Sequence, residues 1–232
     1  MSVAIQPKGW CPGALRPMLS GDGYLVRLRI RGGVVSASAA RAVADCAQRY
    51  GNGLLDLSAR ANLQLRGVQE ASLPALVEAL QSHGLIDESA EAEAVRNVLA
   101  SPLAGLSPDA AFDIRPYVRA LEQRLASDEA LHGLPSKFGF IVDDGGELSL
   151  SNIGADIRFV ALPGESAPRF MASLAGCDDA AVIEAADLPD VAARLAVARA
   201  RRRAPELDAR VVEEDGPLPF ADDRFDVVWA GE

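Results

Sequence analysis

The sequence predicts an α+β fold made of a β-α-β-α unit, a second α/β lobe and a helical tail. Three observations lead to this prediction. Two early segments alternate apolar and polar residues as strands do, a capped helical pattern follows each of them, and the last third of the chain is rich in alanine. Of the 232 residues, 49% are hydrophobic and 24% are charged, which is typical of a packed globular protein.

The first unit is expected over residues 1–86, after a Pro- and Gly-rich entry, KGWCPGALRPMLSGDG. The segment YLVRLRI predicts a strand with its apolar residues on one face and Arg27 and Arg29 on the other. Ser36 or Ser38 can cap a helix through AARAVADCAQRY, and a second helix, LPALVEALQSH, begins behind Ser72. The order predicts two adjacent strands covered on one side by two helices, which is a ferredoxin-like arrangement.

The strand between these helices is expected in LSARANLQLRGV, residues 57–68. Because side chains alternate along a strand, Arg60, Asn62, Gln64 and Arg66 would share one face and the leucines the other. Two guanidiniums and two amides on a rigid strand would form a carboxylate-binding site, since an arginine can donate two parallel hydrogen bonds to one carboxylate. The spacing alone favours the other interpretation, an amphipathic strand with a solvated polar face.

The second lobe is expected over residues 87–165. Its segments predict a helix through AEAEAVRNVLA, a loop in SPLAGLSPDAAFD, an amphipathic helix from about Pro116 to Leu131, a hairpin turning at DDGG, and a strand in IGADIRFVAL. Residues 166–232 read as an Ala-rich helical tail with a basic RARRR segment and an acidic end.

Charge and composition exclude several classes of function. The formal net charge of −10 argues against a general nucleic-acid or anionic-membrane surface, because both need concentrated positive charge. MSVAIQPKGW lacks the apolar core of a secretory signal, so a cytoplasmic location is expected. The three cysteines, Cys11, Cys46 and Cys177, are widely separated and form no metal-binding motif.

Two further cations stand at junctions, where loops commonly build sites. Arg96 lies at the expected end of a helix directly before the SPLAG loop, and Lys137 lies in LPSKF at the entrance to a strand. Each also has an ordinary structural reading, since arginine in a last helical turn interacts with the helix dipole and lysine is common at strand edges.

Five segments, in their order along the chain, resemble the N-terminal half of the nitrite/sulfite reductase superfamily. They are KGWCPGALRPMLSGDGYLVRLRI, YGNGLLDLSARANLQLRGV, RNVLASPLAGLSPDAAFDIRP, LPSKFGFIVDDGG and DIRFVAL. Within that superfamily the CPG and SGDG entry and KFGF are most similar to the precorrin-3B synthase branch. The resemblance covers residues 8–162.

The resemblance implies a set of site residues. In haem-bearing relatives, matching basic residues surround the tetrapyrrole carboxylates and the bound anion, and these fall on Arg60, Arg96 and Lys137. The adjacent polar residues of the same strand, Asn62, Gln64 and Arg66, would be supporting donors.

One position departs from the reductase pattern. The second lysine of the PRKFK-like segment is Gly139 here and its arginine is Ser136, which makes a poorer sulfite or nitrite site. A roomier pocket favours the precorrin branch, whose substrate is a polycarboxylate macrocycle. The resemblance therefore implies an oxidoreductase of cobalamin biosynthesis, whose reaction is an oxygen-dependent hydroxylation with lactone formation.

The family uses a [4Fe–4S] cluster, together with sirohaem in the reductase branch, and the cluster cysteines lie in its second half. Three scattered cysteines cannot supply four thiolates, so the redox centre is expected from a second reductase half or another subunit, and this chain alone is expected to be catalytically incomplete. The alternatives are a sulfite or nitrite reductase fragment, a non-catalytic tetrapyrrole-binding module, and a degenerate remnant.

The chain's end has a separate likeness. DGPLPF and RFDVV resemble the acidic loop and following strand of class I S-adenosylmethionine-dependent methyltransferases. Such enzymes need an upstream Gly-rich turn for the cofactor, and the sequence before this end has none, so methyl transfer is not expected.

Overall fold

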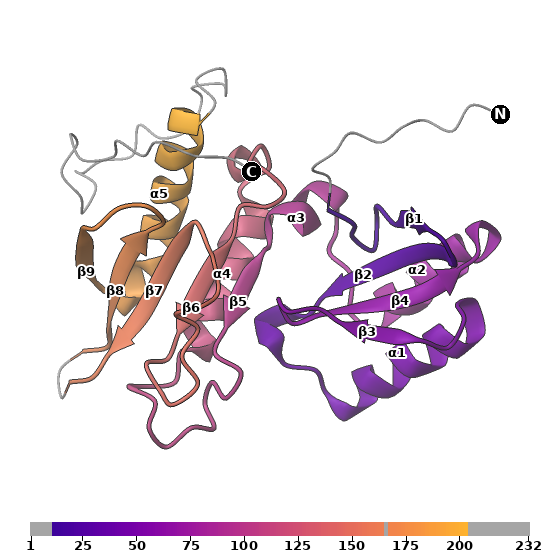
Figure 1. Cartoon of the computed structure of the whole chain (residues 1–232), viewed down its shortest axis with the longest axis horizontal. Coiled ribbons are helices and arrows are strands. Elements are labelled where there is room, and N and C mark those ends of the chain that lie inside the picture. The colour runs from indigo at the N-terminus through magenta and orange to yellow at the C-terminus, as the bar shows by residue number, and fades with distance from the viewer. Residues whose placement is uncertain (1–10, 165–166, 204–232) are drawn as a thin grey trace. The chain divides into compact units, whose positions relative to one another are not determined.

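The structure is a computed structural model that describes residues 11–164 and 167–203. It divides into two compact units, Met1–Asn97 and Val98–Glu232, and each is described by itself. The α+β class predicted from the sequence is confirmed (Figure 1). Within the described ranges, no helix is long and apolar enough to cross a bilayer. The methyltransferase-like end lies outside the described residues.

The first unit contains a four-stranded antiparallel sheet in the order β1-β2-β4-β3. Its strands are β1 (Met18–Ser20), β2 (Gly23–Arg29), β3 (Leu55–Leu57) and β4 (Asn62–Val68). The helices α1 (Ala37–Tyr50) and α2 (Leu73–Ser82) lie on one face of this sheet (Figure 1), as the sequence predicts. The short helix α3 (Ala90–Val95) follows in the same unit.

The core of the first unit forms between that sheet face and the two helices. Val26 and Leu28 of β2 meet Leu65 of β4, together with α1 residues that include the buried thiol Cys46. Gly67 has a φ of 65°, which favours glycine, and the pairing of β2 with β4 shifts register beside it. The register shift lets Val68 join Leu65 in the core.

The strand expected from Leu57 to Val68 is in fact a hairpin. β3 ends at Leu57, a tight turn follows, and β4 begins only at Asn62, so Arg60 lies in the turn rather than on the strand face. The backbone amide of Asn62 donates to the Ser58 hydroxyl, and Ala61 has a φ of 55°. The turn contains no glycine or proline, so no turn-forming residue marks it in the sequence.

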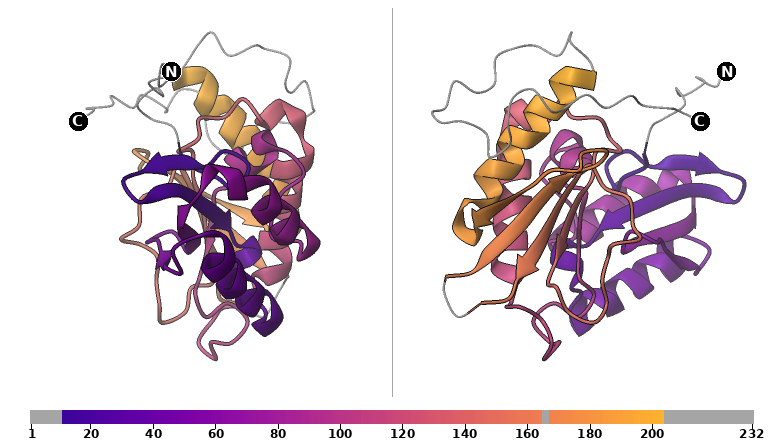
Figure 2. Two further views of the ribbon diagram at one scale, coloured as in Figure 1. Left: turned by 90° about the vertical axis from the view of Figure 1, so that its right-hand side faces the viewer. Right: turned by 60° about the vertical axis from the view of Figure 1, so that its left-hand side comes forward.

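The second unit contains a five-stranded mixed sheet in the order β5-β6-β7-β8-β9. The strands β5 (Val98–Ala100), β6 (Phe140–Asp143) and β7 (Ile157–Leu162) are parallel, and β8 (Arg169–Leu174) and β9 (Ala180–Glu184) continue antiparallel. The helices α4 (Arg115–Ser127) and α5 (Leu188–Arg203) lie behind one face of the sheet (Figure 2). Phe170 is at the centre of that core, with edge-to-face contacts to Phe112, Tyr117 and Phe159.

The hairpin expected at DDGG is a crossover instead, because β6 and β7 are parallel. The buried Asp143 carboxylate accepts the amide protons of Gly145 and Leu150, at 2.9 and 2.8 Å, which folds the following loop back on itself. Leu150 then packs on Leu99 and Ile141 on the sheet face opposite the helices. These contacts prevent ELSL from forming a returning strand.

Two other expectations are corrected. The helix expected through AEAEAVRNVLA ends at Val95, because Arg96 has a non-helical backbone and its side chain bonds to the Arg29 carbonyl, and Val98–Ala100 is strand β5. The helical tail expected from residue 166 begins only at Leu188, since β8 and β9 come first. The residues around Phe170 form strand β8 rather than helix because pairing with β7 brings the Phe170 ring into the aromatic core.

Candidate functional site

The polar face of the first sheet, opposite its helices, carries paired basic and amide side chains. The antiparallel register places Arg27 of β2 opposite Gln64 of β4, and Arg29 opposite Asn62. Arg27 Nη2 donates to Gln64 Oε1 at 3.5 Å. The Nε atoms of both arginines are buried and have no hydrogen-bond partner among the residues that the structure describes. We call these four residues the arginine–amide face.

The arginine–amide face carries the positive charge of two arginines. In the part of the chain that the structure describes, neither Arg27 nor Arg29 forms an ion pair with a carboxylate. Arg29 is only 7% exposed, and burial lowers its pKa, while Glu93 acts in the opposite direction. Two neighbouring cations with buried, unpartnered donors would gain by receiving an anion, because burial weakens solvent screening.

Arg66, a predicted supporting donor, is occupied within the first unit. Its guanidinium contacts Asp22 at 3.0 Å, Asp56 at 3.3 Å and the Ser20 hydroxyl at 3.2 Å. These bonds raise the pKa of Arg66 and hold the pKa of Asp22 below its usual value. Arg66 therefore links β4 to β1 and β3, the two outer strands of the sheet, beside the arginine–amide face.

Arg96 is buried and ion-paired. Its guanidinium donates to both carboxylate oxygens of Asp87, at 2.8–3.2 Å, and to the Arg29 carbonyl at 2.7 Å. Asp87 also pairs with Arg31 at 3.1 Å. Arg96 thus holds the end of β2 through the Arg29 carbonyl.

Glu93 links helix α3 to the entry segment. Its buried carboxylate accepts the amide protons of Ala14 and Leu15, at 2.6 and 3.1 Å. Burial raises its pKa, and these two hydrogen bonds oppose that shift only in part. A Cβ at Gly13 would clash with the Glu93 carboxylate, so a larger residue there would displace that side chain.

The predicted site residues are therefore only partly brought together. Asn62 and Gln64 lie on the arginine–amide face, and Arg96 contacts it through a backbone carbonyl. Arg60 is half-buried at the tip of the β3–β4 hairpin. Lys137 is exposed in the second unit, shortly before β6.

Sequence reasoning missed Arg27 and Arg29 as site residues, although it placed them correctly on the face opposite the core. The available signal was the pairing of YLVRLRI with ANLQLRG: if two adjacent antiparallel strands each bury their alternate apolar residues, their polar residues must share the other face.

The cysteines do not fit a four-thiolate cluster. The chain has three, of which Cys46 is buried in the first-unit core and Cys177 belongs to the second unit. Among the described residues, no group of three or more potential metal-ligating side chains of His, Cys, Asp or Glu occurs. No step of a reaction is therefore assigned to a cluster held by this chain.

Comparison with known proteins gives two adjoining matches. Residues 16–83 match the nitrite/sulfite reductase ferredoxin-like half domain, and residues 91–188 match the nitrite and sulphite reductase 4Fe-4S domain. A precorrin-3B synthase from Sinorhizobium is 36% identical over 75% of this chain and 37% of its own length. A ferredoxin–nitrite reductase from Synechococcus elongatus is 33% identical over 62% of this chain and 29% of its own.

Among solved structures, the NirA protein of Mycobacterium tuberculosis has the same fold, with a TM-score of 0.61 at 22% identity. It is matched over 75% of this chain and 33% of its own length. The chain thus spans about a third of the length of each of these relatives.

Proposed function

The chain belongs to the nitrite and sulphite reductase superfamily, and we propose that it binds the carboxylates of a tetrapyrrole as part of a precorrin-3B synthase-like oxidoreductase. The observation that carries this proposal is the arginine–amide face, where two arginines lack carboxylate partners among the described residues. The relative named precorrin-3B synthase supports the choice of ligand class.

The geometry suits a carboxylate ligand. Arg27 is half-buried, so its guanidinium can donate hydrogen bonds to a ligand carboxylate while protein atoms shield the ion pair from water. Gln64 and Asn62 stand opposite the arginines and can donate through their amide nitrogens. Arg96 holds the Arg29 backbone in place, so the two cations are positioned before a ligand arrives.

The outlying predicted residues would supply further contacts. Arg60 at the hairpin tip remains a candidate donor to a carboxylate, and so does Lys137 in the second unit taken by itself, while Arg66 supports the strand that carries Gln64. The redox centre would come from outside this chain, from a second reductase half or another subunit, because its cysteines do not fit a cluster.

The test is a titration of the full chain with uroporphyrin, followed by absorbance and porphyrin fluorescence. The key variant is Arg27→Gln, and the matched control is Arg41→Gln, which removes the same charge from an exposed position on α1. Saturable binding by the wild type, weakened roughly tenfold or more by Arg27→Gln and unchanged by the control, is expected.

Other outcomes separate the alternatives. Absence of saturable uroporphyrin binding in the folded wild type would refute the proposal. Several relatives are ferredoxin–nitrite reductases, so nitrite and sulfite are titrated in parallel. If these anions bind at the arginine–amide face and uroporphyrin does not, the chain belongs with the reductases. If uroporphyrin binds but no turnover follows when a reductase second half is supplied, the non-catalytic binding module is favoured.

A further inference from the structure

Two consecutive carboxylates are buried at the carboxyl end of β6, in the second unit. Asp143 and Asp144 are each only 2% exposed. In the part of the chain that the structure describes, neither of them forms an ion pair. A buried charge is strongly unfavourable unless hydrogen bonds or a counter-charge compensate it, so the partners of each carboxylate show whether it is stable by itself.

Asp143 is compensated by hydrogen bonds. One of its oxygens accepts the amide proton of Gly145 at 2.9 Å, and the other accepts that of Leu150 at 2.8 Å. The hydroxyls of Ser101 and Ser149 lie at 3.5 and 3.4 Å from the same carboxylate. Because the protein supplies donors to both oxygens, Asp143 needs no further ligand.

Asp144 is only half compensated. Its Oδ1 accepts the Gly146 amide proton at 3.0 Å, whereas its Oδ2 is buried and has no hydrogen-bond partner among the described residues. The Ser107 hydroxyl lies nearby, because a Cβ built on Gly146 would be 3.1 Å from Asp144 Oδ1 and 3.2 Å from Ser107 Oγ. Two oxygen atoms therefore border the space that a Gly146 side chain would fill, and one carboxylate oxygen beside it lacks a partner.

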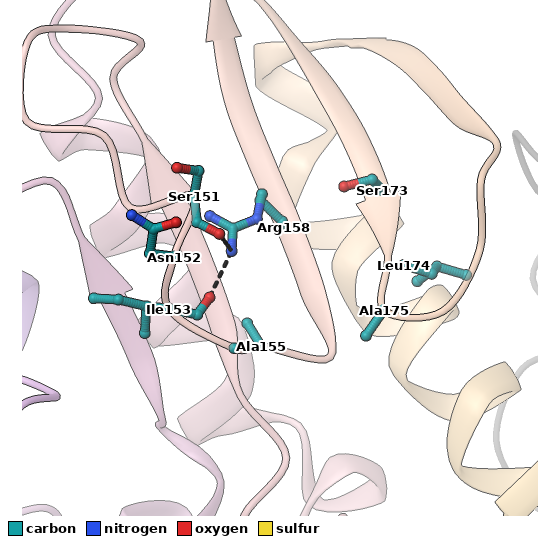
Figure 3. A pocket seen from close by; sticks show the side chains of 9 residues that line it. Ser151, Asn152, Ile153, Ala155, Arg158, Ser173, Leu174 and Ala175 are labelled. Atoms are coloured by element: carbon teal, nitrogen blue, oxygen red, sulfur yellow. Dashed lines mark hydrogen bonds between the residues drawn. The ribbon is translucent and has the colours of Figure 1, made fainter. Parts of the chain in front are cut away.

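These oxygens lie where the connections of two adjacent parallel strands separate. The connection after β5 leads to α4 and is joined to Asp144 by two hydrogen bonds, from the Asp144 amide to Ser101 Oγ and from the Ala111 amide to the Asp144 carbonyl, both at 2.8 Å. The connection after β6 crosses the opposite sheet face, where Arg158 donates to the Ile153 carbonyl at 2.6 Å (Figure 3). Ligands of parallel sheets commonly bind outside the carboxyl ends of the strands at such a point.

We propose that Asp144 is a ligand of a hard divalent cation, Ca²⁺ or Mg²⁺, with the Ser107 hydroxyl as a neighbouring oxygen donor. Both ions take oxygen ligands, and Mg²⁺ is commonly held by one or two carboxylates while it keeps several waters. The described residues include no group of three or more metal-ligating His, Cys, Asp or Glu side chains, so the expected Kd is weak, about 1 mM. The site lies at the opposite end of β6 from Lys137, so it is independent of the proposed function.

The competing explanation is that a buried water molecule or a proton satisfies Asp144 Oδ2. Hydrogen exchange of peptides from β6 separates the two, measured on the full chain in EDTA and then with increasing Ca²⁺ or Mg²⁺. Asp144→Asn removes the charge at nearly constant size, and the matched control, Glu147→Gln, removes a charge from an exposed position of the same loop. Peptides from β2 and β4 are the internal reference, because they belong to the other compact unit. Their protection in EDTA, together with that of β6, shows that each variant is folded.

A cation site with a Kd of about 1 mM predicts that 10 mM of the bound ion raises the protection of β6 roughly tenfold. The rise should be the same in Glu147→Gln, smaller in Ser107→Ala and below twofold in Asp144→Asn. Unchanged protection of the wild type with both ions would overturn the proposal in favour of a water or a proton. An equal rise in Asp144→Asn would also overturn it, because it would reflect general ion binding to a chain of net charge −10. An undiminished rise in Ser107→Ala would remove the hydroxyl from the site.

Discussion

Removing Arg96 should destabilise the first unit strongly, because it would leave a buried charge without its main partner. Arg96 and Asp87 each have only 3% of their side chain exposed. In Arg96→Met, Asp87 would keep only Arg31, which is 56% exposed, and the Arg29 carbonyl would lose its donor. Breaking a buried pair from one side costs about 3–5 kcal/mol of unfolding free energy.

The matched comparison removes both charges. In Arg96→Met/Asp87→Leu no buried carboxylate is left unpaired, so the remaining loss is chiefly the unsatisfied Arg29 carbonyl, about 1–3 kcal/mol. The double variant should therefore be more stable than Arg96→Met, and the control Arg41→Met should resemble the wild type.

Because the chain has two units, a global unfolding midpoint would mix two processes. Amide hydrogen exchange, measured by mass spectrometry on peptides from β2 and β4, reports on the first unit directly. A loss of about 3 kcal/mol lowers protection there by roughly 150-fold. If Arg96→Met loses less than about 1 kcal/mol of unfolding free energy, or if the double variant is less stable than Arg96→Met, the reasoning about the buried Arg96–Asp87 pair is refuted.

Three further predictions follow from the same structure. Because the folded pKa of Glu93 is raised above 4.5, its contribution to stability is fully present below pH 4.5 and is lost as pH rises through the folded value. The difference between wild type and Glu93→Gln in the free energy of opening of the first unit, measured by hydrogen exchange of β2 and β4 at several pH values, should therefore fall over that window, and a flat difference would contradict it. Arg66→Gln should raise the pKa of Asp22 towards its usual value in an NMR titration, and an unchanged Asp22 would contradict the ion pair. Gly145→Ala should cost about 1–3 kcal/mol in thermal unfolding, because Gly145 has a φ of 70° and a Cβ would lie 2.8 Å from the Ala161 carbonyl; Gly154→Ala, where a Cβ meets nothing within 4 Å, should cost less.

The fold of the first unit was predictable because its strands and helices follow simple periodic patterns. Alternation in YLVRLRI and ANLQLRG identified β2 and β4, and Ser36 does cap α1 by accepting the Ala39 amide proton. The turn at Arg60 was missed because no glycine or proline marks it. A short local pattern cannot show where a strand begins when the turn is stabilised by a hydroxyl such as that of Ser58.

The second unit was less predictable because its features depend on long-range contacts. DDGG is a common hairpin signal, and only the parallel pairing of β6 with β7 shows that the chain crosses over instead. Similarly, the partners of Arg96 were not predicted: Asp87 was not singled out from the sequence, and its carboxylate accepts a hydrogen bond from Arg96 at 2.8 Å.

The buried position of Cys46 provides a kinetic reporter of the first unit. Cys46 is 6% exposed within the first-unit core, whereas Cys11 and Cys177 are partly accessible. An alkylating reagent should therefore modify Cys11 and Cys177 early and reach Cys46 only when the first unit opens. The labelling rate at Cys46, followed by mass spectrometry, would measure the opening of that unit in the intact chain without any introduced probe.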